Sequence, residues 1–538
     1  MAQTFHVHIQ RFDPNESLEI SIKTYEVNWH PSQTVLEVLN EIQTQQDDSL
    51  SFRSSCQAGK CGSCAVALDG KPVLACRTMV QGQELHLGPL PGFPVVKDLI
   101  IDRTGYEEDF LRMLAATKAL EPEDKPAACL LETEIDYSNL SCCIGCLVCT
   151  AACPVAARLE ENAPNPAVMT SVLSSGVRVD RKEGKAFPIG GNTDYCSLCL
   201  NCQAACPAGV SLNRVNAQVK DAWVQTQGQS LRDWMLGRAE LAGRLGSLFP
   251  SLSNRVLENR LVRRGMESAL GISSKAKMIP YAESKTPSVS RAQGLKTAAG
   301  KHKVALFLGC YSRYNDTDPG RDGLAVLEEL GVRVEVPEQT CCGLPLVSSG
   351  DLTAASKKAE TNIKAFQAWI DRGFEIVTSC TSCSLMLKHE YTEVLGLQTA
   401  AGFAGQTRDL GEYLLGLLDS GDVRPNLTPV PMQAAYHTPC HLRAQKIGLP
   451  FMELLKKIPD FEVAVLDAPC CGQSGTYGFK AEKYELSRAV GQKLADSLNT
   501  LEPEIALSEC GPCQIRMHDC SGLPVAHPVS ILRRALDI

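Results

Sequence analysis

Apolar and polar residues alternate at the start of the chain. Residues 5–9 alternate with a period of two, which predicts a strand. Residues 35–42 carry apolar side chains at helical spacing. Residues 61–76 follow the order cysteine loop, strand, Asp-Gly turn, strand, and an Asp-Gly pair between apolar runs is a hairpin signal. These patterns predict a small β-rich domain over residues 1–105.

The middle of the chain lacks this alternation. Residues 106–225 are predicted to be helical, with two cysteine runs that interrupt the helices, because Pro154 and Pro207 follow the runs and cannot continue a helix. Residues 226–301 are predicted to form a basic amphipathic region followed by a linker of small and polar residues. Nine basic and four acidic residues lie between positions 228 and 281, in a chain whose net charge is −8.

The last part of the chain contains an internal repeat. Each copy begins with an apolar strand that leads into a cysteine, at residues 304–308 and 433–437. A helix, a Cys-Cys-Gly, a second helix, a short strand and a Cys-x2-Cys follow in both copies. Strands that alternate with helices predict two tandem α/β modules, over residues 302–425 and 426–538. The predicted fold is therefore multidomain, α+β and α/β.

Composition narrows the class of protein. The chain has 538 residues, 44% hydrophobic and 21% charged, which is ordinary for a globular protein of several domains. Its negative net charge predicts no bulk attraction to nucleic acid. We see no secretory signal at the start and no apolar run of about 18 residues, so we expect a cytoplasmic protein with no membrane span of its own.

Cysteine spacing changes this picture most, because 22 of the 25 cysteines fall into five ordered arrays. The first array has the plant-type [2Fe–2S] spacing. Its cysteines are Cys56, Cys61, Cys64 and Cys76. Small residues in this loop let backbone N–H groups approach the cluster sulfurs. Structural zinc favours two Cys-x2-Cys knuckles, so zinc fits the spacing poorly.

Two further arrays repeat the run Cys-x2-Cys-x2-Cys-x3-Cys-Pro of two-cluster ferredoxins. In that pattern the fourth cysteine of each run serves the other cluster. The predicted ligands of one [4Fe–4S] cluster are Cys143, Cys146, Cys149 and Cys206. Those of the other are Cys196, Cys199, Cys202 and Cys153. A reduced compartment follows from this interpretation, since such runs are poor disulfide patterns.

The last two arrays, one in each α/β module, hold five cysteines each. The first comprises Cys310, Cys341, Cys342, Cys380 and Cys383, and the second comprises Cys440, Cys470, Cys471, Cys510 and Cys513. Adjacent cysteines rarely form a disulfide with each other, whereas five soft thiolates suit iron–sulfur or zinc. Spacing predicts a metal in each module and leaves a cubane, an unusual cluster and zinc open.

Some cysteines and histidines stand outside these ligand sets. Cys129, Cys142 and Cys520 are interpreted as inert thiols. His437 and His441 flank Cys440, and each is a candidate ligand. Because five thiolates are already present, a hydrogen-bonded structural histidine is the favoured interpretation of both.

The first part of the chain resembles a known family. Residues 1 to about 210 resemble the iron–sulfur subunit of succinate dehydrogenase and fumarate reductase, on non-ligand residues as well as cysteines. The matching segments are Arg11-Phe12-Asp13-Pro14, Phe52-Arg53-Ser54-Ser55-Cys56, Gly70-Lys71-Pro72-Val73-Leu74-Ala75-Cys76 and Phe93-Pro94-Val95-Val96-Lys97-Asp98-Leu99. The resemblance implies a β-grasp [2Fe–2S] ferredoxin domain, an α-helical ferredoxin domain and an FAD-containing partner. That family usually has a [3Fe–4S] cluster at its last site, whereas the complete run here implies [4Fe–4S].

The rest of the chain resembles a second group. From about Cys143 onward it is similar to the C subunit of anaerobic glycerol-3-phosphate dehydrogenase and the B subunit of heterodisulfide reductase. The matching segments are Phe307-Leu308-Gly309-Cys310, Thr340-Cys341-Cys342-Gly343-Leu344-Pro345, Tyr436-His437-Thr438-Pro439-Cys440-His441-Leu442 and Cys470-Cys471-Gly472-Gln473-Ser474-Gly475. The resemblance implies two further [4Fe–4S] clusters of non-cubane type in these CCG modules. A chain that joins both halves is similar to the B subunit of thiol:fumarate reductase.

These observations give one leading function and two alternatives. No dinucleotide fingerprint or P-loop is present, so the substrate site is expected on a partner flavoprotein. The leading hypothesis is an electron-transfer subunit of a succinate dehydrogenase/fumarate reductase-like complex, with a quinone or a thiol/disulfide pair as second couple. The first alternative is the iron–sulfur subunit of an anaerobic glycerol-3-phosphate or 2-hydroxy-acid dehydrogenase. The second is a zinc-binding scaffold or redox sensor, which does not explain the ferredoxin spacings.

The basic region between positions 228 and 281 has two interpretations. Its apolar residues and arginines suit the surface of a membrane, which places the protein peripherally on the inner face of the cell membrane. Alternatively, its helices pack across the cluster domains, as apolar stripes usually do.

Overall fold

The computed structural model describes residues 4–81, 84–118, 137–158, 195–282 and 301–538. The chain divides into two compact units. One comprises Met1–Cys196 with Leu200–Asn216, and the other comprises Ser197–Cys199 with Ala217–Ile538. The five-part division predicted from the sequence is finer than this and remains a prediction.

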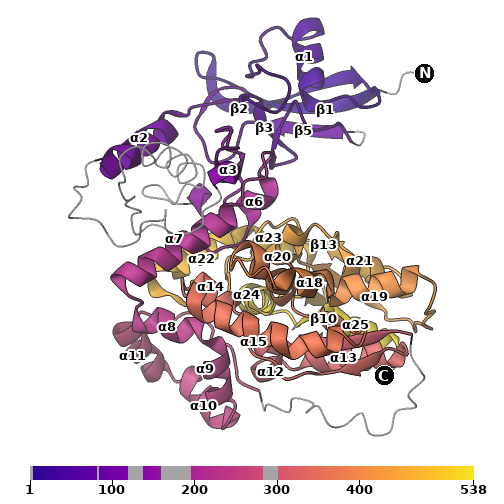
Figure 1. Ribbon diagram of the computed structural model, residues 1–538. Coiled ribbons are helices and arrows are strands. Elements are labelled where there is room, and N and C mark those ends of the chain that lie inside the picture. Colours follow the sequence, from indigo (N-terminus) through magenta and orange to yellow (C-terminus); the bar gives the residue numbers. More distant parts are fainter. Residues whose placement is uncertain (1–3, 82–83, 119–136, 159–194, 283–300) are drawn as a thin grey trace. The chain divides into compact units, whose positions relative to one another are not determined.

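The first unit begins with a five-stranded sheet of order β2-β1-β5-β3-β4 (Figure 1). Its strands are β1 (Thr4–Asp13), β2 (Ser17–Asn28), β3 (Ala65–Leu68), β4 (Lys71–Leu74) and β5 (Glu84–Gly88). β1 runs antiparallel to β2 and parallel to β5. A small second sheet pairs β6 (Val95–Lys97) with β7 (Ile100–Ile101). Phe5, Val7 and Ile9 are buried in turn, which confirms the predicted strand.

One long helix packs against the core of this sheet. α1 (Val35–Gln45) begins at a capping box, in which the Thr34 side chain accepts from the Glu37 backbone and the Glu37 side chain accepts from the Thr34 backbone. The apolar face of α1 is buried in the same core as β1 and β5, which confirms the predicted helix. This packing holds in place the sheet from which the first cysteine loop extends.

Helices follow in the remainder of the first unit. They are α2 (Thr104–Lys118), α3 (Tyr137–Leu140), α4 (Val148–Ala151), the short η2 (Ala156–Arg158) and α6 (Asn201–Ala205). α7 (Leu212–Gln227) begins in the first unit and ends in the second. The prediction of helices interrupted by cysteine runs is confirmed for the described part of residues 106–225.

The second unit opens with four short helices, α8 (Leu231–Gly237), α9 (Ala239–Gly246), α10 (Pro250–Glu258) and α11 (Arg260–Leu270). α9 packs closely on the next module, because a Cβ at Gly243 would lie 2.8 Å from the ring of Tyr314. Other side chains of these helices remain exposed, among them Leu245, Leu248 and Phe249. The packing of α9 agrees with the second interpretation of the basic region, and contact with a membrane surface stays a prediction.

Two parallel sheets form the rest of the second unit. The first, of order β11-β10-β8-β9, contains β8 (Lys303–Phe307), β9 (Arg333–Glu335), β10 (Glu375–Thr378) and β11 (Thr407–Asp409). The second, of order β13-β12-β14-β15, contains β12 (Met432–Tyr436), β13 (Phe461–Val465), β14 (Ile505–Leu507) and β15 (Val525–Ala526). Numbered within its own module, each sheet has the strand order two-one-three-four. The predicted internal repeat is therefore confirmed as a repeat of topology.

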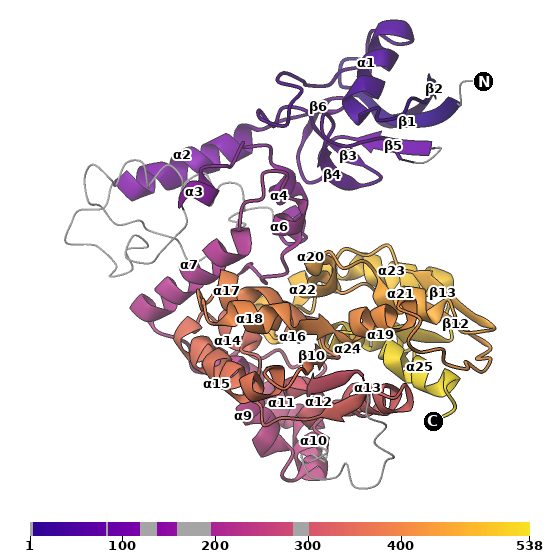
Figure 2. The same ribbon diagram turned by 45° about the vertical axis from the view of Figure 1, so that its right-hand side comes forward.

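Helices surround and join the two sheets. Those of the first module are α12 (Gly309–Tyr314), α13 (Asp318–Glu329), α14 (Leu344–Ser348), α15 (Leu352–Ile370), α16 (Thr381–Leu385), η4 (Met386–Glu390), α17 (Tyr391–Glu393), α18 (Ala400–Gly405) and α19 (Leu410–Asp419). Those of the second are α20 (Cys440–Gln445), α21 (Pro450–Leu455), η5 (Tyr477–Phe479), η6 (Ala481–Lys483), α22 (Tyr484–Val490), α23 (Gln492–Leu501), α24 (Gly511–Ser521) and α25 (Pro528–Ala535). α13 packs on α25 and α19 packs on α21, so that one hydrophobic core continues through both modules (Figure 2). Among the described helices, none has the length and apolar character needed to cross a bilayer.

Candidate iron–sulfur sites

The first cysteine loop is closed by the hairpin of β3 and β4. Asp69 and Gly70 have φ angles of 49° and 73°, so both central turn residues are left-handed, as a type I′ turn requires. The resulting register lets the Ala75 N–H donate to the Cys64 carbonyl at 3.0 Å. This bond holds Cys64 close to Cys76. Both cysteines are buried, and they interact electrostatically with each other. The turn thus brings two predicted ligands together.

Backbone N–H groups surround the sulfurs of the other two predicted ligands. The N–H groups of Ala58 and Lys60 donate to Cys56 Sγ at 3.4 and 3.2 Å, and the Cys56 N–H donates to Cys61 Sγ at 3.5 Å. The Ser63 hydroxyl, 3.1 Å from Cys61 Sγ, and the backbone N–H groups of Cys56 and Ser63 lower the pKa of Cys61 to about 6. Such contacts stabilise a thiolate, which is the form that ligates iron.

The first cysteine run comes together with the end of the second run. Burial, with a smaller repulsion from Cys206 and Cys143, raises the pKa of Cys146 to about 11. Burial and repulsion from the same cysteines also raise the pKa of Cys149. The structure therefore places Cys206 beside the first run, as in the ligand set predicted from the crossed ferredoxin pattern.

Backbone geometry repeats between the two runs. Leu147 and Leu200 each follow the second cysteine of a run, and they have φ angles of 65° and 63°. Each leucine immediately precedes a short helix, α4 or α6, which carries the third cysteine. A left-handed conformation at a leucine is unusual, and its recurrence shows that both runs fold into the same loop.

The first cysteine loop touches the first run within the first unit. Gly62 has a φ of 70°, and a Cβ there would lie 2.7 Å from the Cα and Cβ of Cys146. No larger residue fits this approach without a shift of the backbone. Gly62 therefore sets how closely the first predicted site approaches the second.

The remaining predicted ferredoxin ligands are placed less completely. Cys153 Sγ accepts from the Ala156 N–H at 3.4 Å. Cys199 belongs to the second unit, where its charge acts on Cys440 and Cys470 of the second module. This loop therefore adjoins the cysteines of that module.

All five cysteines of the first module converge. The Sγ atoms of Cys341 and Cys310 lie 3.6 Å apart. Contacts with Cys310 and Cys342 lower the pKa of Cys341 well below its usual value, whereas contacts with Cys342 and Cys380 raise that of Cys383. Glu240 of α9 accepts from the Cys341 N–H at 3.1 Å, a contact that the sequence did not reveal.

The second module repeats this convergence. Cys471 and Cys513 have their Sγ atoms 3.2 Å apart, and contacts with Cys470 and Cys513 lower the pKa of Cys471 well below its usual value. Burial raises the pKa of Cys440, which lies within electrostatic reach of Cys471 and Cys510. Most thiols of the two sites have raised pKa values and resist ionisation unless a cation joins them, so both sites fit an iron–sulfur group. The thiols with raised pKa values are Cys310, Cys342, Cys383, Cys440, Cys470 and Cys513.

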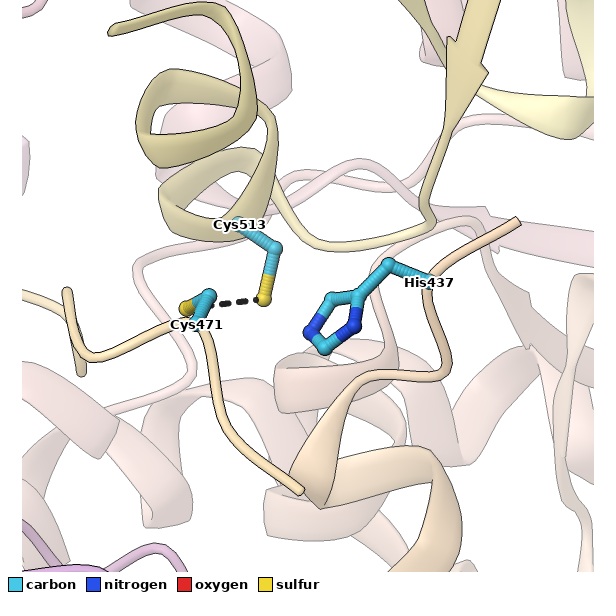
Figure 3. A group of neighbouring side chains, drawn as sticks. All are labelled: His437, Cys471 and Cys513. Carbon is cyan, nitrogen blue, oxygen red and sulfur yellow. Dashed lines mark hydrogen bonds between the residues drawn. The ribbon is translucent and has the colours of Figure 1, made fainter. Parts of the chain in front are cut away.

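The two histidines that flank Cys440 differ. His441 lies 2.8 Å from the Ser382 hydroxyl and 3.3 Å from the Leu198 carbonyl oxygen, as expected of a hydrogen-bonded histidine. His437 is fully buried, and among the described residues neither of its ring nitrogens has a hydrogen-bond partner. It lies beside Cys471 and Cys513 (Figure 3). The hydrogen bonds of His441 agree with the favoured interpretation, whereas for His437 that interpretation stays a prediction.

Both five-cysteine sites line one cavity of about 180 Å³. The cysteines on its walls are Cys199, Cys310, Cys342, Cys380, Cys383, Cys440, Cys471, Cys510 and Cys513. Tyr311 also lines it, and its ring packs so closely on Gly511 that a Cβ there would lie 2.4 Å away. A small molecule in this cavity would meet both modules at once.

Three cysteines stand outside the predicted ligand sets. Cys142 is exposed, and the Cys520 thiol donates to the Met517 carbonyl at 3.4 Å. Cys129 lies outside the described residues.

Fold and cysteine geometry define an iron–sulfur protein, and comparison with known families agrees. A "2Fe-2S iron-sulfur cluster binding domain" matches residues 6–108, a "4Fe-4S dicluster domain" matches residues 139–210, and a "Cysteine-rich domain" matches residues 304–388 and 434–518. These matches confirm the predicted domain types and their order along the chain.

Three relatives indicate the family. The C subunit of anaerobic glycerol-3-phosphate dehydrogenase from Escherichia coli is 31% identical over 396 residues, 73% of this chain and 98% of that one. The B subunit of fumarate reductase (CoM/CoB) from Methanothermobacter marburgensis is 27% identical over 96% of this chain and 94% of its own length. Iron–sulfur subunit 1 of mitochondrial succinate dehydrogenase from Oryza sativa is 30% identical over 39% of this chain and 79% of its own length.

The chain therefore belongs to the family of iron–sulfur subunits that serve dehydrogenases and reductases of the succinate, fumarate and glycerol-3-phosphate types. It is an iron–sulfur electron-transfer subunit, which confirms the resemblance drawn from its motifs.

Proposed function

We propose that this chain carries electrons between the FAD of a partner flavoprotein of succinate dehydrogenase/fumarate reductase type and a second redox couple. The single observation that supports this most is the joint presence, in one chain, of the [2Fe–2S] domain and two five-cysteine sites. A fumarate reductase subunit is similar to this chain over 96% of its length, which includes all of these sites. The alternative partner, a glycerol-3-phosphate or 2-hydroxy-acid flavoprotein, is favoured by the relative that is 31% identical.

Five groups of cysteines hold the redox centres in this proposal. The first loop holds a [2Fe–2S] cluster, the two crossed sets hold [4Fe–4S] clusters, and each five-cysteine site holds a further [4Fe–4S] cluster. Clusters bound there supply one-electron transfer over a range of potentials. The chain itself fixes their spacing: Gly62 allows the first loop to touch Cys146, and Cys199 adjoins Cys440 and Cys470.

The second couple binds, we propose, in the cavity between the two five-cysteine sites. It is either a quinone or a thiol/disulfide pair. A disulfide needs two electrons and two protons to give two thiols, and a cavity walled by both sites offers two one-electron donors to one molecule. The fumarate reductase relative named for CoM/CoB supports the thiol pair in this role.

The exposed apolar side chains of α8–α11 support peripheral contact with the inner face of the cell membrane. The chain itself would then be cytoplasmic. Leu248, Phe249 and Leu261 expose 66–75% of their surface on this basic region. Apolar side chains interspersed with arginines are the composition that interfacial helices use on anionic membranes.

Fumarate should reoxidise the reduced centres of the native complex. The complex is purified without oxygen, its clusters are reduced, and visible absorbance is followed after fumarate is added. Full recovery of the oxidised spectrum is expected with fumarate and none with the carboxylate control malonate. A spectrum that responds to dihydroxyacetone phosphate and ignores fumarate would assign the chain to the glycerol-3-phosphate type. Separate additions of a quinone and of a disulfide then identify the second couple.

A further inference from the structure

His437 differs from His441, the other histidine that flanks Cys440, in what surrounds its ring. Its exposed fraction is 0%, and neither ring nitrogen has a partner at ordinary hydrogen-bond distance among the described residues, although the ring acts electrostatically on Cys471. A buried polar group with no partner costs free energy, so a ligand or an ordered group is expected beside it. A ring nitrogen and the Sγ atoms of Cys471 and Cys513 lie within 4.8 Å of one another.

The backbone holds this ring in place. The His437 N–H donates to the Leu507 carbonyl at 2.9 Å, and the His437 carbonyl accepts from the Ser508 hydroxyl at 3.1 Å. These bonds continue the pairing of β12 with β14 to the end of the strand. Figure 3 shows the ring directed toward the two sulfurs from the side opposite Cys471. The sheet therefore fixes the backbone that carries this ring.

The first module has no such group at the matching position. Phe307 ends β8 three residues before Cys310, just as His437 stands three residues before Cys440. Phe307 is fully buried and packs on Phe366, with ring centroids 5.8 Å apart. The repeat thus places an apolar ring beside one five-cysteine site and an imidazole beside the other.

We propose that His437 donates a ring N–H to a ligand sulfur of the second five-cysteine site, Cys471 or Cys513, and so makes this site easier to reduce than the first. This rests on the proposed binding of iron–sulfur clusters by both sites. A hydrogen bond to a ligand sulfur stabilises the more negative, reduced state and raises the potential. His437 is a positioning and tuning residue, not a ligand.

The test is redox titration of His437→Phe and His437→Gln, monitored by electron paramagnetic resonance. His437→Phe copies the first module, and we expect the ratio of reduced to oxidised second site to fall about tenfold at a fixed potential, as a charge-assisted hydrogen bond implies. A tenfold change corresponds to about 59 mV for one electron. His437→Gln retains an N–H donor and should recover part of the shift. The first site serves as the internal control and should not move.

Three outcomes would overturn this proposal. An unchanged second site in His437→Phe excludes the hydrogen bond, and an equal shift at both sites indicates a general structural effect. Strong hyperfine coupling to a directly bonded nitrogen in the wild type would make His437 a ligand instead. An iron-free second site in the wild type would refute the proposed cluster assignment, and is recognised separately by iron analysis.

A second candidate binding site lies in the basic region and is formed by different residues. A cavity of about 600 Å³ lies between α10, α11 and residues 274–280. Five cationic side chains and two carboxylates line it: Arg260, Arg263, Arg264, Lys275, Lys277, Glu258 and Asp519. Asn254 ties α10 to Tyr281 by two hydrogen bonds, of 2.9 and 2.8 Å, so the cavity wall is fixed.

Positive charge predominates in this cavity: Lys275 pairs with Glu485 at 2.6 Å, and the other four cations face two carboxylates. Arg263 is only 5% exposed, and it donates to the carbonyl oxygens of Ser273 at 2.5 Å and Ala276 at 2.7 Å. Within the described residues no carboxylate lies within ion-pair distance of Arg263, and its burial lowers its pKa. A buried cation without a counter-ion favours an anionic ligand.

The helices of the basic region, α8 to α11, expose many apolar side chains. Eleven of the 22 exposed large hydrophobic residues in the described part of the chain lie between Leu231 and Val262. We infer that the cavity binds a phosphate group, with anionic phospholipid as the source that this apolar surface favours. The phospholipid source rests on the membrane contact proposed above, whereas the phosphate site itself does not.

Two double variants, each lacking two positive charges, distinguish binding in this cavity from long-range electrostatic attraction. Arg260→Gln/Arg264→Gln removes two charges from the cavity, and Arg244→Gln/Arg255→Gln removes two exposed charges of the same region outside it. The full-length protein is sedimented with phosphatidylcholine vesicles containing phosphatidylglycerol, at ionic strength on the order of 0.5 M to screen distant charges. We expect about 30-fold weaker binding for the cavity variant, on the order of fivefold per charge, and little change for the control.

Inorganic phosphate distinguishes the two sources. Phosphate binding lost only in the cavity variant, with vesicle binding unaffected, supports the site with a soluble ligand. Equal losses in both variants, or no loss in either assay, would overturn the site. Wild-type protein that ignores vesicles refutes the membrane contact, while its phosphate binding still tests the cavity.

Discussion

Cys206→Ser should remove the same [4Fe–4S] cluster as Cys146→Ser, although residue 206 belongs to the other cysteine run. The structure places Cys206 within electrostatic reach of Cys146 and Cys149, although they are far from it in sequence. Serine is a poor ligand for iron in place of a thiolate, so the cluster should be lost or reduced to three irons. We expect up to about four iron atoms fewer per chain.

Matched variants make this test specific. The residual electron paramagnetic resonance spectra of Cys206→Ser and Cys146→Ser should coincide, and they should differ from that of Cys153→Ser. Cys142→Ser is the control, because Cys142 is exposed and one residue outside the register of its run. If the spectrum of Cys206→Ser instead matches that of Cys199→Ser, each run serves its own cluster.

Gly472→Ala should destabilise the second module strongly. Gly472 follows the cysteine pair with a φ of 80°, and a Cβ there would lie 2.0 Å from the Ser487 carbonyl oxygen and 2.8 Å from the Gly491 nitrogen. Both contacts are backbone atoms, which cannot move aside as a flexible side chain can. A left-handed alanine costs about 1–2 kcal/mol and overpacking about 1–3 kcal/mol, so the free energy of unfolding should fall by roughly 3 kcal/mol or more.

Gly475→Ala provides the control for the left-handed backbone. Gly475 has a φ of 62°, and a Cβ there meets nothing within 4 Å, so only the conformational cost of about 1 kcal/mol applies. Thermal unfolding followed by circular dichroism, with iron analysis, compares the two. Equal losses of stability in the two variants would show that the left-handed backbone conformation, and not the contact with Ser487, determines the cost.

The sequence predicted the elements with strong local patterns. Period-two alternation predicted β1, helical spacing predicted α1, and the repeated cysteine order predicted two modules of one topology. These features depend on neighbours a few residues apart, or on a motif that is visible twice. Spacing also grouped the five cysteines that converge in each module.

Features that depend on distant residues were not predictable. Glu240 binds the Cys341 N–H across 101 residues of sequence, and only packing of α9 on the first module brings them together. The shared cavity likewise arises from the way two modules pack. His437 matched the pattern of an ordinary structural histidine, because no sequence signal shows whether a ring nitrogen finds a partner.

The continuous core of the two α/β modules has a mechanical consequence. The segment that joins them is itself anchored, since the Thr428 N–H donates to the Ala535 carbonyl at 2.7 Å and the Val430 N–H to the Pro459 carbonyl at 3.0 Å. Val430 is buried within the common core. This anchoring opposes hinge motion at the joint, so we expect the separation of the two five-cysteine sites to stay constant when their charge changes. We then expect any gating of electron flow to depend on what enters the cavity between them.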